Sequence, residues 1–251
     1  MKTTFIVIIT FLFFISIRPN CVAQSEKDTL KILFVGNSYT YFGNLPQIIS
    51  TISDDANTKL VTKKSTVGGA KLRDHWLGER GLDTKEMIAD GEFDLVILQE
   101  YSMGTINEPD SLIKYSNLFC DFIYKNNAKP YFYLTWAREM VPQYQETINN
   151  VYLEASIENK AEIVPVGKAW ALAKQLRPNI ELYHADGSHP SELGTYLAAC
   201  VFIASILDEI PGKLKGSFWT MDKYGESVQL MSVHPLDVVF CKKIAEEITS
   251  E

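Results

Sequence analysis

Five short segments of the chain carry the apolar pattern of buried β-strands. In the clearest of them, four apolar residues follow one another directly from Ile32 to Val35. The others combine aliphatic, aromatic and β-branched residues, which are the types that strands favour. We predict strands at residues 30–35, 59–65, 94–99, 130–135 and 161–166.

Between these strands lie segments with apolar residues at the three- and four-residue spacing of a helix face. Pro46 suits the opening turn of the first, because the missing N–H group would be unpaired there in any case. The segment 208–236 contains three glycines and is predicted to be irregular. We predict helices at residues 45–55, 109–127, 142–160 and 193–207, and a terminal helix from about Pro235.

Alternating strands and helices indicate a parallel sheet with helices on both faces, because each crossover returns over the sheet. We therefore predict an α/β fold, a doubly wound sheet of about five parallel strands. No repeat, low-complexity tract or linker divides residues 24–251, which we treat as one domain. Ligands of such sheets bind beyond the carboxyl ends of the strands, so reactive residues are expected there.

The first 23 residues have the pattern of a secretory signal peptide. Lys2 precedes an apolar run at residues 5–17, which is shorter than the ~20 residues that a membrane span requires. We expect cleavage after Ala23 and a secreted or periplasmic mature protein without a membrane span. Acylation at Cys21 is the alternative, but the residues before it are unlike those of a lipoprotein signal.

The formal net charge of the chain is −7. Because no basic cluster offsets this acidity, nucleic acid is not an expected partner. Three cysteines, Cys120, Cys200 and Cys241, follow the signal segment, each within an apolar stretch and without CxxC spacing. We expect small buried side chains, and a single disulfide stays open as an alternative.

Ser38 lies where the first predicted strand runs into a turn, in the sequence Gly36-Asn37-Ser38. A serine in such a turn is most often a helix cap or a loop residue, and the alternative is a nucleophile. Other polar segments also follow predicted strands or precede the long helix. They are Gly68-Gly69, Gln99-Glu100, residues 136–139 and residues 183–194.

The last of these segments contains Asp186 and His189, followed by Pro190 and by Ser191, a candidate helix cap. A serine hydroxyl needs a base to take its proton, and the imidazole needs an acceptor on its other nitrogen. His189 and Asp186 would supply both groups to Ser38. A catalytic triad of Ser38, His189 and Asp186 is therefore predicted.

A metal site is the competing hypothesis for the same segment. His184, Asp186 and His189 form an H-x-D-x-x-H pattern of acceptable zinc ligands. However, three ligands from one short loop need further ligands to build a catalytic site, and no H-E-x-x-H motif occurs. We therefore expect neither a metal nor another cofactor.

Four segments together resemble the conserved blocks of SGNH (GDSL-like) hydrolases: FVGNSYT, GGAKL, VILQEYS and DGSHPSELG, spread between residues 34 and 194. The resemblance implies a flavodoxin-like three-layer α/β/α fold and a metal-free serine esterase. It assigns Ser38 as nucleophile, Asp186 and His189 as its partners, and the backbone N–H groups of Ser38 and Gly69 as oxyanion donors.

Two positions depart from the family pattern. Asn37 replaces the usual aspartate before the serine but keeps a turn-forming side chain. Gln99 occupies the position of the asparagine whose side chain donates to the oxyanion, so we expect its longer amide to serve instead. The following Glu100 completes a Gln-Glu pair that resembles the carbohydrate acetylesterase branches of the superfamily.

We expect the substrate to be a small acylated molecule, and we favour a carbohydrate. Aromatic residues near the strand ends could stack on sugar rings, although each is more often a packing residue. The candidate substrate-binding residues are Tyr39, Trp76, Glu100, Tyr101, Trp136 and Arg138. We predict an O-acetylesterase, with a generic short-chain esterase as one alternative and a non-catalytic carbohydrate-binding protein as the other.

Overall fold

The computed structural model describes residues 27–250. Its centre is a five-stranded parallel sheet in the order β2-β1-β3-β4-β5. The strands are β1 (Asp28–Gly36), β2 (Thr58–Thr66), β3 (Leu95–Leu98), β4 (Lys129–Tyr133) and β5 (Glu162–Val164). The predicted fold class and all five predicted strands are confirmed, whereas the expected signal peptide and Cys21 lie outside the described residues.

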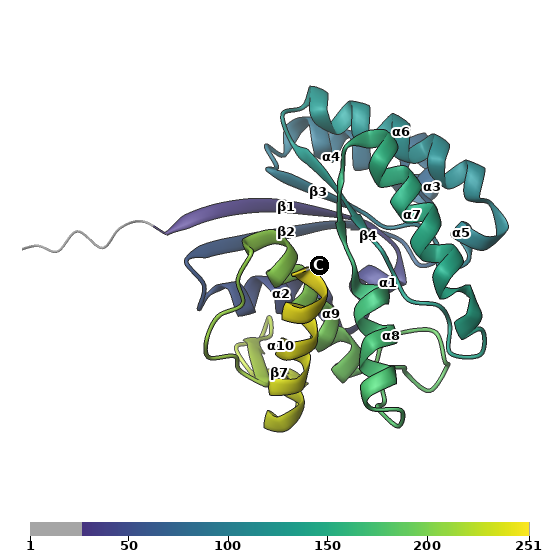
Figure 1. Cartoon of the computed structure of the whole chain (residues 1–251). Helices are drawn as coiled ribbons and strands as arrows, with labels where there is room; N and C mark the ends of the chain where they lie inside the picture. Colours follow the sequence, from purple (N-terminus) through teal and green to yellow (C-terminus); the bar gives the residue numbers. More distant parts are fainter. Residues whose placement is uncertain (1–26, 251) are drawn as a thin grey trace, which may run out of the picture.

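Helices cover both faces of this sheet, which gives three layers (Figure 1). On one face lie α2 (Leu45–Ser53), α8 (Val166–Leu176), α9 (Glu192–Leu207) and α10 (Pro235–Thr249). On the other lie α3 (Leu72–Leu77), α4 (Thr84–Asp90), α6 (Pro109–Lys125) and α7 (Gln145–Asn159). The remaining helical elements are short: α1 (Ser38–Tyr41), η1 (Phe42–Asn44), η2 (Glu79–Gly81), α5 (Gly104–Asn107) and η3 (Pro142–Tyr144).

The alternation of side chains along β1 divides the core into two parts. Ile32 and Phe34 face the α2, α8, α9 and α10 layer, and Leu33 and Val35 face the α3, α4, α6 and α7 layer. All four are fully buried. Successive residues of a strand point to opposite faces, so a strand buried on both faces reads as a continuous apolar run.

Several elements were not foreseen, among them a hairpin and the helices α3, α4 and α8. Residues 208–236, predicted to be irregular, contain an antiparallel hairpin of β6 (Ser217–Met221) and β7 (Ser227–Ser232). Most of its residues are exposed, so the strands lack the alternation that reveals a half-buried strand. Helix α8 was missed because its first residue, Val166, continued the apolar run assigned to the strand before it.

Two smaller expectations concern the helices. Cys120, Cys200 and Cys241 are buried and free, as the apolar surroundings predicted. Within residues 27–250, no helix combines the length and the hydropathy that crossing a membrane would require.

The strand order places the end of β1 at a topological switch point. β1 and β3 are neighbours, and the chain leaves β1 toward β2 on one side and leaves β3 toward β4 on the other side. The crevice at such a point, beyond the carboxyl ends of the strands, is the usual ligand site of doubly wound sheets. Ser38 follows β1 after one intervening residue and so lies at this position.

Candidate active site

The turn after β1 presents Ser38 at the first position of α1. The helix cap is Asn37, whose Oδ1 accepts a hydrogen bond from the Tyr39 N–H group at 3.1 Å. The Nδ2 group of Asn37 donates to the Ala70 carbonyl at 2.9 Å. Since Asn37 does the capping, the Ser38 hydroxyl is free for other partners.

Two buried side chains support this turn from below. Gln99 Oε1 accepts hydrogen bonds from the Asn37 N–H group and from the Thr40 hydroxyl, each at 3.0 Å. His75 Nε2 donates to the Gly36 carbonyl at 2.9 Å, and its Nδ1 accepts from the Thr84 hydroxyl at 2.7 Å. Burial lowers the pKa of His75 to about 4, so its imidazole is neutral at pH 7.

Gly36 allows the close approach of these groups. A Cβ atom at this position would lie 2.5 Å from Gln99 Oε1 and 2.5 Å from Thr40 Oγ1. Any larger residue would push the glutamine away from the turn, so the glycine belongs to the same arrangement.

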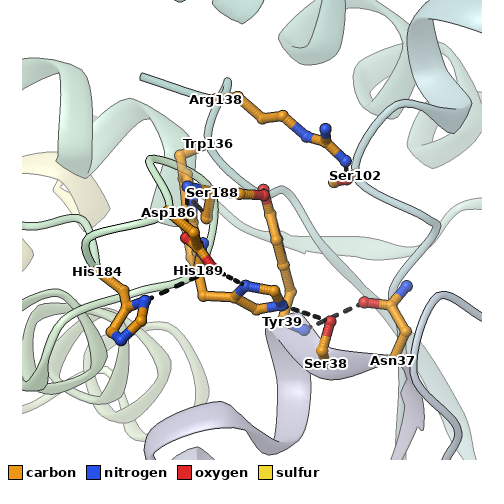
Figure 2. A network of polar contacts seen from close by, with 10 residues as sticks. All are labelled: Asn37, Ser38, Tyr39, Ser102, Trp136, Arg138, His184, Asp186, Ser188 and His189. Atoms are coloured by element: carbon orange, nitrogen blue, oxygen red, sulfur yellow. Dashed lines mark hydrogen bonds and ion pairs between the residues drawn. The ribbon is translucent and has the colours of Figure 1, made fainter. Parts of the chain in front are cut away.

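Ser38, His189 and Asp186 form a continuous hydrogen-bonded chain (Figure 2). The Ser38 hydroxyl lies 2.8 Å from His189 Nε2, and His189 Nδ1 lies 2.6 Å from Asp186 Oδ2. Oxygen to nitrogen distances of this size suit proton transfer from a serine to an imidazole. The sequence predicted the three residues as a triad, and the structure brings their side chains together.

Asp186 is held as a carboxylate. Partial burial acts to raise its pKa, but hydrogen bonds from the His189 side chain and from the Ser188 and His189 N–H groups hold it well below its ordinary value. The two N–H groups each lie 2.9 Å from Oδ1. The carboxylate therefore orients the imidazole and can stabilise its positive charge.

The loop that carries His189 is fixed by aromatic residues. Trp136 Nε1 donates to the Ser188 carbonyl at 2.9 Å, and the Tyr39 and Ser188 hydroxyls lie 2.8 Å apart. Tyr39 stacks on Trp136 with ring centroids 4.8 Å apart, and Trp136 stacks on Trp170 of α8 at 3.9 Å. Tyr39 and Trp136 are thus buried supports of the loop, in place of the predicted sugar-stacking surface.

The turn after β2 carries Gly69. The Ala70 N–H group donates to the Val67 carbonyl, and Gly69 has a φ of 69°, a conformation that glycine adopts without strain. Because Gly36 pairs with Thr66 in the sheet, this turn lies beside the one that bears Ser38. Neither the Ser38 nor the Gly69 N–H group donates to any other residue described by the structure.

Gln99 does not take the position expected of an oxyanion donor. Its side chain is fully buried, its oxygen faces the Asn37 N–H group, and its Nε2 donates to the Glu100 carbonyl. Exchanging the amide oxygen and nitrogen would set two donors against each other at Asn37, which fixes the orientation. The longer arm of glutamine folds beneath the turn and supports it.

Glu100 is also buried and does not reach an open surface. Its Oε1 accepts from the Tyr101 N–H group at 2.7 Å and its Oε2 from the Leu72 N–H group at 3.2 Å. Burial raises the pKa of Glu100 to about 7. The residue joins the loop after β3 to the start of α3.

Two further candidates lie at the site and one does not. Tyr101 and Arg138 are half-buried beside Tyr39, and the Arg138 guanidinium donates to the Tyr101 hydroxyl at 3.3 Å. Trp76 packs instead against Phe119 and Phe122 of α6. The structure thus places the Trp76 ring in the interface between α3 and α6.

The metal hypothesis finds little support in the arrangement of the loop. His184 Nδ1 lies 3.5 Å from Asp186 Oδ2, but His189 Nδ1 contacts the same carboxylate oxygen. Among residues 27–250, no group of three or more histidine, cysteine or acidic side chains is arranged to hold a metal ion.

Three residues of the site were not singled out from the sequence. Phe42 stacks on the His189 imidazole with centroids 4.7 Å apart, Ser188 bonds Tyr39, and Ser102 accepts from Arg138 at 2.9 Å. Ser188 lies inside the predicted D-x-x-H segment, and Phe42 and Ser102 lie a few residues beyond Ser38 and Gln99. Their closeness in sequence to these motifs was the signal that could have identified the three residues.

Comparisons with known proteins define the fold. No protein-family model and no curated protein sequence matches the chain. Among solved structures, the chain is similar to a protein described as an SGNH hydrolase from Slackia heliotrinireducens, with 24% identity and a TM-score of 0.60 over 71% of this chain and 100% of that one.

Two other solved structures are similar over comparable lengths. One is a DUF4886 family protein from Bacteroides uniformis, with 17% identity and a TM-score of 0.69 over 88% of this chain and 94% of that one. The other is the acetyl xylan esterase AlAXEase, with 14% identity and a TM-score of 0.58 over 70% and 100%. The chain therefore has the fold of the SGNH hydrolases.

Proposed function

We propose that this chain, which has the SGNH hydrolase fold, is a secreted serine esterase that removes O-acyl groups, chiefly O-acetyl groups, from carbohydrate. The observation that carries the proposal is the hydrogen-bonded chain from Ser38 through His189 to Asp186. A serine in a structural role has no need of an imidazole that is itself oriented by a carboxylate.

The mechanism follows from these distances. His189 Nε2 takes the proton of Ser38 as the hydroxyl oxygen attacks the ester carbonyl, and Asp186 stabilises the resulting imidazolium. The N–H groups of Ser38 and Gly69 donate to the oxyanion. His189 then returns the proton to the departing alcohol, and a water activated by the same imidazole releases the acid from Ser38.

The carbohydrate substrate is supported by two observations. An acetyl xylan esterase is among the structures that the chain is similar to. The Gln99-Glu100 pair, at the end of β3, is the pair on which the resemblance to carbohydrate acetylesterases rests. Secretion rests on the apolar run at residues 5–17 and the cleavage site expected after Ala23.

The test is hydrolysis of p-nitrophenyl acetate and acetate release from acetylated xylan by protein that lacks residues 1–23. We expect Ser38→Ala to lower kcat by about 10⁴-fold or more, as for triads in general. Ser217→Ala, at an exposed position of β6, is the matched control and should leave kcat unchanged. Equal activity of wild type and Ser38→Ala would exclude the proposal, and loss of activity in EDTA with recovery on zinc would favour the metal hypothesis.

A further inference from the structure

Arg138 extends from the loop after β4 toward the loop after β3 (Figure 2). Its Nη2 group donates to the Ser102 hydroxyl at 2.9 Å and to the Tyr101 hydroxyl at 3.3 Å. The guanidinium carbon lies 6.0 Å from the centre of the Tyr101 ring. The three side chains thus form a cluster, which we call the Arg138 cluster.

The cluster holds a positive charge without a counter-ion. Arg73 and Arg177 pair with carboxylates at 2.9 and 2.7 Å, whereas Arg138 has no ion-pair partner among residues 27–250. Its neighbour Glu139 lies nearest to Lys174, at 3.9 Å. A half-buried cation loses hydration without gaining an opposite charge, so an anion bound here would be favoured.

The hydrogen bonds of the cluster leave donors free. Arginine has donors only, so the Tyr101 and Ser102 hydroxyls accept from it with their oxygens and keep their own hydrogens for another acceptor. Arg138 Nη1 has no hydrogen-bond partner among the described residues, and Nε is buried without one. Nη1 and the Tyr101 hydroxyl hydrogen are therefore the groups available to the oxygens of an anion, whereas the Ser102 hydroxyl also neighbours the Tyr39 hydroxyl.

The cluster lies next to the catalytic residues. Burial raises the pKa of Tyr39, and the Ser188 and Ser102 hydroxyls and the positive charge of Arg138 act against this rise. Tyr39 directly follows Ser38, and its ring centroid lies 5.7 Å from that of His189. In Figure 2, Arg138 and Ser102 lie at the hydroxyl end of Tyr39, and Ser38 lies at its backbone end.

We propose that the Arg138 cluster is a subsite for a carboxylate of the substrate, so that the enzyme acts by preference on acylated acidic sugars such as acetylated uronic acids. This inference rests on the proposed esterase function and adds the substrate class to it. Guanidinium and hydroxyl donors gathered in one cluster are suited to carboxylate oxygens. Because Tyr39 neighbours both Arg138 and His189, we place the carboxylate and the ester on one substrate molecule.

The kinetic test compares two substrates that differ in one group, an acetylated methyl glucuronoside and the acetylated methyl glucoside. We expect the wild type to have a kcat/KM about tenfold or more higher for the acid, as for a hydrogen bond to a charged group. Arg138→Met should bring this ratio close to one, and Arg138→Lys should keep part of it. Arg73→Met, which removes the same charge from an exposed ion pair, should retain the ratio.

A binding test separates the subsite from the chemistry. In Ser38→Ala protein, calorimetry should show about tenfold tighter binding of the acidic sugar, and the double variant Ser38→Ala/Arg138→Met should lose this difference. Hydrolysis of both sugars with equal kcat/KM would overturn the subsite and leave the esterase standing. If binding depends on Arg138 but the wild type hydrolyses neither sugar, the esterase function would be overturned and the subsite would stand. Circular dichroism of each variant confirms that it is folded.

Discussion

Gln99 Oε1 lies 3.0 Å from the backbone nitrogen of Asn37, the residue that precedes Ser38. This contact joins the end of β3 to the nucleophile turn and is buried from solvent. Together with the His75 bond to the Gly36 carbonyl, it fixes the backbone on which the serine stands. The position of the nucleophile is therefore set by buried residues beneath the turn.

Replacing Gln99 should affect stability and activity together. Gln99→Leu leaves the Asn37 N–H group buried without a partner, which costs about 1–3 kcal/mol. We expect the free energy of unfolding, measured with urea, to fall by this amount and kcat to fall as the turn relaxes. Gln143→Leu, at an exposed position, is the control. A fall in kcat of ~10²-fold or more with unchanged stability would instead indicate that the Gln99 amide donates to the oxyanion.

Glu100 should make stability depend on pH. Its pKa in the folded protein is about 7, raised from 4.5 by burial. The folded state therefore keeps a proton that the unfolded state loses, so its stabilising effect is complete below pH 4.5 and is lost as the pH rises through 7. The total change is about 3 kcal/mol. Because burial lowers the pKa of His75 to about 4, that residue contributes the opposite slope in the acid part of this range, so the decline is read as a difference. Across pH 5–8, the free energy of unfolding of the wild type, measured with urea, should fall relative to that of Glu100→Gln.

The control for this experiment is Glu247→Gln, which removes an exposed carboxylate and should preserve the decline. An identical slope in Glu100→Gln and the wild type would show that another group causes the pH dependence.

Trp136 should influence catalysis through the loop that bears His189. Trp136→Phe removes the hydrogen bond to the Ser188 carbonyl, and we expect kcat to fall by about tenfold because the imidazole is less firmly placed. Stability should also fall, by about 1 kcal/mol for the lost bond. Steady-state kinetics and thermal unfolding measure the two effects.

The matched control is Trp219→Phe, at an exposed position of β6, where neither quantity should change. An unchanged kcat in Trp136→Phe, with stability reduced, would mean that other contacts are sufficient to hold the loop.

Strand positions were predictable because β1 and β3 are buried on both faces and therefore read as continuous apolar runs. The rule that ligands bind beyond strand ends then placed Ser38, Asp186 and His189 at one edge of the sheet. The direction of a side chain was not predictable in the same way. Gln99 turns beneath the nucleophile because the Asn37 N–H group needs an acceptor, and no sequence pattern specifies such a contact.

The aromatic residues show the same limit of sequence interpretation. Trp76 and Trp136 both follow polar residues near strand ends, yet one packs against α6 and the other against Trp170. Their environments depend on helices α6 and α8, which lie far away in the sequence. The hairpin of β6 and β7 was hidden because its residues face solvent on most sides.

The stack of Tyr39, Trp136 and Trp170 runs from the residue after the nucleophile into the interior beneath α8. An engineer who altered Trp170 to improve heat resistance would therefore be changing the support of the histidine loop as well. Directed evolution of this scaffold should conserve that column of rings and place its diversity at the rim around Tyr101.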